Sequence, residues 1–260
     1  MKNIAPLLFI IALTFPYSNL KAQRLTLGAK GGMNSSSLTG TNSDNPFFGS
    51  NTLKIGKEFG IHGELHVTPT LSYSIGIEYS TQGGLNKFTT LTTPQSFTPS
   101  SLFPKLYSNF SSDINLNYIL FPVLIRQRLK INTNLSAYGG IGPCFGLLVS
   151  ANRDEISDEN IYTDPEKKNK LPYTLQEVLG NSSQKLNGLN LGLNGILGLS
   201  YKLNKKEAIF IEMGIYYGMS PIQNSNADGT SNPLAKMISF GYAYTLKEHY
   251  KNRYRKAILN

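Results

Sequence analysis

Residues 186–203, LNGLNLGLNGILGLSYKL, alternate between large apolar and small residues in a way that few folds accommodate. From Leu189 to Tyr201 every second residue is large and apolar, with Gly195 as the one gap. A period of two predicts a β-strand with two different faces. The intervening positions carry mainly Gly, Asn and Ser, whereas a water-facing strand usually carries longer polar side chains. An apolar outer face over a small, polar inner face is typical of strands in an outer-membrane β-barrel.

The same alternation recurs in seven further segments, at residues 25–36, 55–68, 71–83, 114–129, 135–150, 208–219 and 237–246. Short turns at 68–70, 130–134 and 204–207 alternate with long polar connections. The sequence therefore predicts an all-β fold, an eight-stranded antiparallel up-and-down transmembrane β-barrel with short periplasmic turns and long outer loops. An even number of strands places both termini in the periplasm. The alternative is a soluble, lipocalin-like barrel with its faces reversed.

Three segments are less clear from the sequence. Residues 119–125 are apolar at consecutive positions, so the two faces of that strand cannot be assigned, and Pro122 is compatible with a bulge or an edge. Residues 85–112 are rich in Ser, Thr, Pro and Phe and are expected to be disordered, with a flap or a partner surface as alternatives. Within the charged loop 151–185, Thr174, Glu177 and Gly180 fit the cap and stop of one short helical turn.

Residues 1–23 have the features of a secretory signal peptide. Lys2 is followed by an apolar run at 7–15, and Ala22 lies at a plausible cleavage point. No later segment approaches the roughly 18 apolar residues of a membrane-spanning helix. We therefore expect an exported chain with a barrel at 24–247 and a basic periplasmic tail at 248–260. Its expected partners are outer-membrane lipid and the barrel-assembly machinery.

The net charge of +9 is concentrated at the predicted periplasmic end. The basic rim and tail predicted there comprise Arg126, Arg128, Lys130, Lys202, Lys205, Lys206, Lys251, Arg253, Arg255 and Lys256. Contact with anionic lipid headgroups is the simplest role, at about 1 kcal/mol for each basic side chain near such a surface. Peptidoglycan or other envelope proteins are further expected partners. Nucleic acid is not expected for an exported barrel.

Seven titratable residues fall on the inward faces: Lys30, Glu58, His62, Glu64, His66, Glu78 and Glu212. They suit either a buried network of paired charges or a metal or acid–base site. In a strand, His62 and His66 lie roughly 13 Å apart, at about 3.3 Å per residue, so HGELH is unsuited to a single zinc ion. Eight strands leave little space beyond side chains, and unpaired buried charges are costly, which favours the network. Symmetric pairing on either side of the Thr68–Leu71 turn would place His62 opposite Glu78.

The sequence points to a protein without catalytic activity, metal or cofactor. The third histidine, His249, lies in the tail, and no exposed Ser–His–acid set is present. Cys144 is the one cysteine, so no intramolecular disulfide forms, and it is interpreted as a small strand residue. The many inward glycines leave a narrow porin or small-ligand barrel as an alternative.

Four segments, LGAKGGMNSSSL, IGIEYSTQGG, YILFPVLIRQRL and AYGGIGPCFGLL, resemble the PorT-type outer-membrane β-barrel family. The resemblance covers residues 24–247 and implies a signal peptide followed by one eight-stranded barrel. Founding members are linked to a protein-secretion and gliding apparatus. The resemblance therefore implies an accessory role in secretion as an alternative to a structural or surface-binding role, and it implies no catalytic residues.

Overall fold

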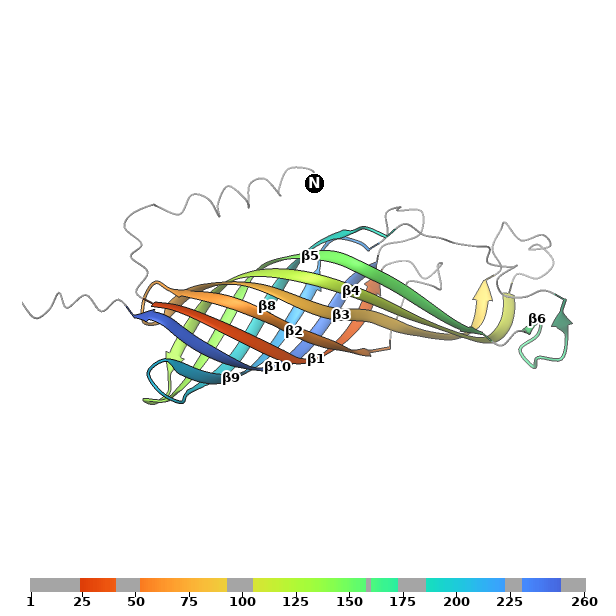
Figure 1. Cartoon of the computed structure of the whole chain (residues 1–260). Helices are drawn as coiled ribbons and strands as arrows, with labels where there is room; N and C mark the ends of the chain where they lie inside the picture. The colour runs from red at the N-terminus through yellow and green to blue at the C-terminus, as the bar shows by residue number, and fades with distance from the viewer. Residues whose placement is uncertain are drawn as a thin grey trace, which may run out of the picture.

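The computed structural model describes residues 24–40, 52–92, 105–157, 160–172, 186–222 and 231–248. Eight long antiparallel strands close into a barrel (Figure 1), as the sequence predicted. They are β1 Arg24–Gly40, β2 Lys54–His66, β3 Leu71–Thr92, β4 Lys105–Lys130, β5 Leu135–Ser157, β8 Leu189–Lys202, β9 Glu207–Gly218 and β10 Ser231–Glu248. Each strand pairs with its neighbours along the chain, and β1 pairs with β10 to close the sheet. No helix among the described residues is long and apolar enough to cross a membrane.

Three tight turns lie at one end of the barrel, here named the turn end, and the opposite end is the loop end. In each turn a short polar side chain accepts hydrogen bonds from nearby backbone N–H groups. Asn132 Oδ1 accepts from the N–H of Leu135 at 2.7 Å, and Asn204 Oδ1 accepts from that of Glu207 at 2.9 Å. Thr68 Oγ1 accepts from the N–H of Leu71 at 2.9 Å. Such side chains mimic a backbone turn, which explains why these connections are short.

The outer surface of the barrel is apolar, as the alternation predicted. Leu193, Leu197 and Leu199 of β8 are exposed, whereas Asn194 and Ser200 between them are buried. The structure also assigns the two faces of β4. Val123 and Ile125 are exposed, whereas Leu116, Leu120 and Leu124 are buried inside the barrel. Both faces of this strand are apolar because part of the barrel interior is apolar.

The interior has two zones along the barrel. The zone towards the loop end is a hydrophobic core made of Leu38, Ile114, Leu116, Tyr118, Leu120, Cys144, Tyr216, Ile222, Ala235 and Met237. The zone towards the turn end holds buried charged and polar residues from β1, β2, β3, β4 and β9. The sequence predicted the polar zone, but the consecutive apolar residues of β4 concealed the apolar one.

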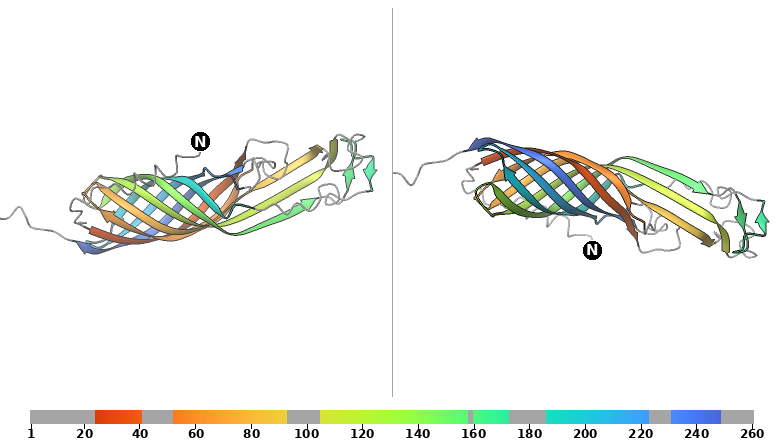
Figure 2. Two further views of the ribbon diagram at one scale, coloured as in Figure 1. Left: turned by 90° about the horizontal axis from the view of Figure 1, so that it is seen from above. Right: turned by 90° about the horizontal axis from the view of Figure 1, so that it is seen from below.

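Strands β3, β4 and β5 continue beyond the barrel at the loop end, where they form a projecting sheet (Figure 2). Pairing between β3 and β4 runs to Thr92 and Lys105, and pairing between β4 and β5 runs to Phe110 and Ser157. The prediction that 85–112 is disordered was therefore wrong at both ends of this segment, as was the prediction that a loop begins at 151. Cross-strand hydrogen bonds order these polar stretches, which periodicity along one strand does not reveal.

A small hairpin of β6 Ile161–Tyr162 and β7 Lys170–Leu171 lies beside β4, where Tyr107 pairs with Tyr162. The carboxylate of Asp164 accepts hydrogen bonds from the backbone N–H groups of Lys168 and Asn169, at 2.8 and 2.6 Å. These bonds stabilise the ionised form and lower the pKa of the Asp164 carboxyl. The helical turn expected at Thr174, the signal peptide and the tail beyond Glu248 lie outside the described residues.

The face assignment predicts opposite responses to substitution at two adjacent positions near the middle of β8. Leu193 is 46% exposed and Asn194 is 1% exposed. Leu193→Arg places a charge on the lipid face and should cost about 2–4 kcal/mol near the bilayer midplane. Asn194→Ser exchanges one small polar interior residue for another and should cost much less. Urea unfolding in lipid vesicles measures both, and equal losses would contradict the assignment.

Candidate functional site

The polar zone contains a group of charged side chains that we call the lumen cluster. It comprises Lys30, Glu58, Glu64, Glu78, Arg126, Arg128, Tyr138 and Glu212. These residues come from β1, β2, β3, β4, β5 and β9. Each occupies an inward position of its strand, so the period of two directs all of them into the barrel.

Lys30 is the centre of the deeper part of the cluster. Its ammonium lies 2.8 Å from Glu78 Oε1, 3.4 Å from Glu212 Oε1 and 3.5 Å from Glu58 Oε1. The Lys30 side chain is only 2% exposed. One cation therefore contacts three carboxylates from three different strands, away from bulk water.

Glu64 is the centre of the part nearer the turn end. Ser72 Oγ donates a hydrogen bond to Glu64 Oε1 at 2.6 Å. Arg128 Nη2 donates to both Glu64 oxygens, at 3.1 and 3.3 Å, and Arg126 lies 3.7 Å away. His66 Nε2 lies 3.6 Å from Glu64 and 3.1 Å from the guanidinium of Arg24. Two arginines thus share one carboxylate.

Glu212 joins the two parts. It contacts Lys30 through Oε1, and its Oε2 accepts a hydrogen bond from the Tyr138 hydroxyl at 2.9 Å. Arg126 Nη2 lies 3.6 Å from the same Oε2 atom. The guanidinium groups of Arg126 and Arg128 lie 5.5 and 5.1 Å from the centre of the Tyr138 ring, a range that permits cation–π attraction. The cluster is therefore continuous from Lys30 to Arg128.

Glycines on neighbouring strands make room for large inward side chains. A Cβ atom at Gly28 would come within 2.4 Å of the His62 ring, and one at Gly198 would come within 2.4 Å of the Tyr138 ring. Gly241 is similarly close to the ring of Phe210. The inward glycines, which suggested a narrow open lumen, instead accommodate rings that fill it.

The structure buries all seven titratable residues that the sequence placed on the inward faces. The predicted pairing of His62 with Glu78 was wrong. His62 pairs with Gly76, and Glu78 pairs with Gly60. The register differs by two residues from symmetric pairing about the turn, so each side chain keeps its predicted face but changes its cross-strand neighbour. The ring of His62 instead lies 5.6 Å from that of Phe210.

The predicted basic rim divides into two groups. Arg126 is 3% exposed, so its side chain lies inside the barrel, and Arg128 is also largely buried. Lys130, Lys205 and Lys206 are exposed at the turn end, and Lys202 is half-buried. Lys251, Arg253, Arg255 and Lys256 lie outside the described residues.

Sequence reasoning missed Tyr138 and Ser72 as partners of the cluster. Tyr138 was identifiable by its inward position in residues 135–150, but its contact with Glu212 depends on Gly198. Ser72 was assigned to the inward face, although its hydrogen bond to Glu64 follows only from the observed pairing of β2 with β3.

Within the described part of the chain, no three His, Cys, Asp or Glu residues are grouped to hold a metal ion.

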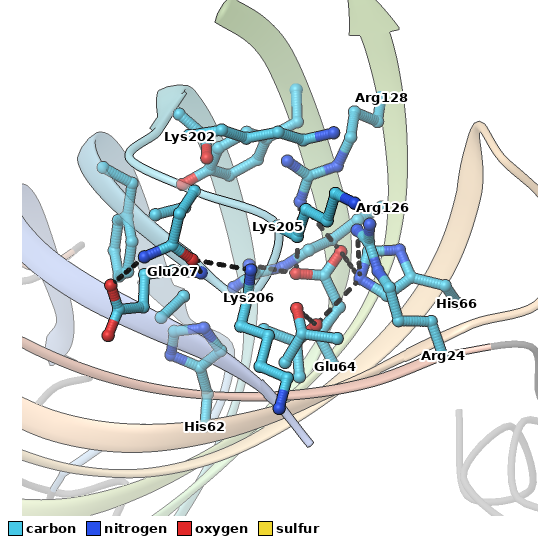
Figure 3. Close-up of a pocket in the computed structure, with 18 residues that line it drawn as sticks. Arg24, His62, Glu64, His66, Arg126, Arg128, Lys202, Lys205, Lys206 and Glu207 are labelled. Carbon is cyan, nitrogen blue, oxygen red and sulfur yellow. Dashed lines mark hydrogen bonds and ion pairs between the residues drawn. The ribbon is translucent and has the colours of Figure 1, made fainter. Parts of the chain in front are cut away.

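A small cavity opens from the cluster at the turn end (Figure 3). We call it the turn-end cavity; its volume is about 40 Å³. Arg126 and Arg128 line its inner part, and the turn between β8 and β9 carries Lys205 and Lys206 at its mouth. The space suits a few water molecules or one small group, because one water needs roughly 10–15 Å³.

The ion pairs of Lys30 predict a large effect of neutralising this residue. Lys30→Met removes the charge at similar length and leaves three buried carboxylates without their common cation. The free energy of unfolding in urea should fall by about 3–5 kcal/mol. Adding Glu78→Gln should restore part of that loss, because one uncompensated carboxylate is removed. Lys57→Met makes the same change on the exposed face of β2, and an equal loss there would contradict the buried-network interpretation.

Solved structures with a similar fold have low sequence identity to this chain. Neisserial surface protein A is 10% identical, with 85% of this chain and 97% of that chain covered and a TM-score of 0.45. OprG from Pseudomonas aeruginosa is 13% identical, with 85% and 95% covered and a TM-score of 0.41. The outer membrane protease OmpT from Escherichia coli is 7% identical, with 87% and 98% covered and a TM-score of 0.30. Among curated proteins, no sequence matches this chain.

The sequence also matches a protein-family model. The model describes an outer membrane protein beta-barrel domain and matches residues 17–224, most of the chain. The match agrees with the closed barrel and its apolar outer face. The chain therefore belongs to the outer membrane protein β-barrel domain family.

Proposed function

We propose that this outer-membrane β-barrel protein is non-enzymatic and that its projecting sheet binds a partner outside the cell. The observation that supports this proposal is the continuation of β3, β4 and β5 past the barrel. Pairing of β5 with β8 ends at Leu147 and Leu189, and β5 continues to Ser157. Beyond the barrel, β5 therefore has one edge without a neighbouring strand among the described residues.

An open strand edge offers backbone groups to an added strand, a common mode of peptide recognition. The base of the projecting sheet is tied to the barrel by an ion pair between Lys54 of β2 and Asp113 of β4. This contact supports a sheet held in a fixed direction relative to the barrel. Preorganisation of that kind lowers the cost of binding.

The interior supports a structural role for the barrel itself. The hydrophobic core fills the zone towards the loop end, and the charges towards the turn end are paired with one another. A filled interior is poorly suited to a narrow porin. Glu64 is held by two arginines and by the hydroxyl of Ser72, an arrangement that suits a structural ion pair.

In this proposal the turn end faces the periplasm. β1 begins and β10 ends at the turn end, so both termini are periplasmic. The exposed Lys130, Lys205 and Lys206 would lie near anionic headgroups or peptidoglycan. The barrel-assembly machinery is the proposed partner for insertion.

An accessory role in secretion is the second candidate function, since the projecting edge would equally suit another envelope protein. A secretion defect on deletion of the protein would favour this role.

Accessibility of two inserted epitopes tests the orientation. One epitope replaces Glu166 in the exposed turn between β6 and β7, and the other replaces Lys205 in the turn between β8 and β9. Antibody should label the first in intact cells and the second only after the outer membrane is permeabilised. Heat-modifiable gel mobility confirms that each variant forms a barrel. The reverse labelling pattern would contradict the proposed orientation.

Photo-crosslinking tests the binding role of the projecting sheet. A benzophenone side chain replaces exposed Asn152 on β5, where the strand has passed its last pair with β8. Irradiation of intact cells should give a discrete protein adduct, which mass spectrometry identifies. The matched control places the same group at Leu193 on the lipid face, where adducts should be with lipid. The binding role is refuted if the two positions give the same adducts.

A further inference from the structure

The turn-end cavity has an unusual excess of positive charge. Six basic side chains line it, against the carboxylates of Glu64 and Glu207; the basic residues are Arg24, Arg126, Arg128, Lys202, Lys205 and Lys206. Figure 3 shows Lys205 and Lys206 among the residues that line the cavity, together with Arg126 and Glu64. Enclosure by low-dielectric walls strengthens such a field and attracts anions.

The carboxylates in the lining do not balance this charge. Glu64 is shared between Arg126, Arg128 and His66. Glu207 accepts a hydrogen bond from the side chain of Asn204 within its own turn. The cavity therefore keeps a positive excess even with both carboxylates ionised.

Arg126 makes only long contacts with the carboxylates around it. Its side chain is 4% exposed, and its contacts with Glu64 and Glu212 are ion pairs at 3.7 and 3.6 Å, longer than hydrogen bonds. Its buried Nε atom has no hydrogen-bond acceptor among the described residues, and neither does Nε of Arg128. Leaving a buried donor without an acceptor costs about 1–3 kcal/mol, and more for charged groups. Both arginines line the cavity, so an acceptor bound there would lie beside them.

We propose that the turn-end cavity binds an anion of the phosphate class, held by the guanidinium groups of Arg126 and Arg128 beneath the ammonium groups of Lys202, Lys205 and Lys206. Guanidinium groups bind phosphate oxygens through paired N–H donors, and lysine adds a mobile point charge. The volume of about 40 Å³ accepts a terminal phosphate but not the group attached to it. The ligand would therefore be a phosphomonoester whose remaining part extends out of the mouth.

This site is independent of the proposed binding role, because it lies at the opposite end of the barrel from the projecting sheet. The same chemistry has two sources. The phosphate belongs either to a soluble ester or to the headgroup of a membrane lipid. A headgroup that ends in a phosphomonoester, such as that of phosphatidic acid, presents the same doubly charged group as a soluble phosphomonoester, so the experiment must separate them.

Isothermal titration calorimetry on the full chain in phosphate-free detergent tests the site, with inorganic phosphate and phenyl phosphate as probes. Both should bind saturably, and salt should weaken the binding through screening. Acetate should bind more weakly, because it carries one charge and two oxygens. No saturable phosphate binding at low salt would overturn the proposal, as would acetate binding as tight as that of phosphate.

Three variants locate the binding. Arg126→Gln should lower phosphate affinity by about tenfold or more, the loss expected for one charged hydrogen-bonding partner. Because Arg126 also pairs with Glu64 and Glu212, the exposed double variant Lys205→Gln/Lys206→Gln provides a second test that spares the interior, with an expected loss of several-fold. Lys130→Gln is the matched control, since Lys130 is exposed at the same end but does not line the cavity. Equal losses in the control and the double variant would show a nonspecific charge effect and refute the site.

Nanodiscs distinguish the two sources. Phenyl phosphate is titrated into the protein in phosphatidylcholine discs and in discs that contain phosphatidic acid. Weaker apparent affinity in the phosphatidic acid discs, abolished by Lys205→Gln/Lys206→Gln, would assign the site to a lipid headgroup. Unchanged affinity would assign it to a soluble phosphate ester.

Discussion

Pairing of β1 with β10 is the interaction on which the rest of the structure depends. A strand in hydrocarbon cannot leave backbone N–H and C=O groups unpaired, so a spanning sheet must close. The two strands pair along their full length, from Arg24 and Glu248 to Gly40 and Ser231. Closure gives every strand two neighbours and a fixed register within the barrel. It thereby assigns each side chain either to lipid or to the interior, since a slip of one residue would expose Lys30 to the lipid.

The interior follows from that assignment. Charged side chains from five strands meet near the turn end, and each carboxylate is close to a cation from another strand. Towards the loop end, apolar side chains fill the same narrow space. Glycines opposite His62 and Tyr138 allow these rings to lie across neighbouring strands. The interior of the barrel is thus filled by complementary large and small residues. The surfaces that remain for binding a partner or ligand from the aqueous phase lie at the two ends of the barrel.

Much of the fold was predictable because alternation is a local property. The sequence predicted the eight long strands, their order and, outside residues 119–125, their inward faces, including the seven buried titratable residues. The errors of the sequence-based prediction concerned which side chains lie next to one another across strands. His62 and Glu78 kept their predicted faces, but the register across the turn gave each a different partner. Arg126, expected at the rim, reaches into the interior because Glu64 and Glu212 lie there.

The sequence by itself determined that the chain forms an outer-membrane β-barrel and, outside residues 119–125, which residues face lipid, since each follows from the alternation of residues along single strands. Only the tertiary structure decided that β3, β4 and β5 continue past the barrel, that the glycines accommodate aromatic rings, and that Arg126 and Arg128 line a cavity at the turn end. These features depend on contacts between residues far apart in the chain. Cross-strand register sets those contacts, and no periodicity within one strand encodes it.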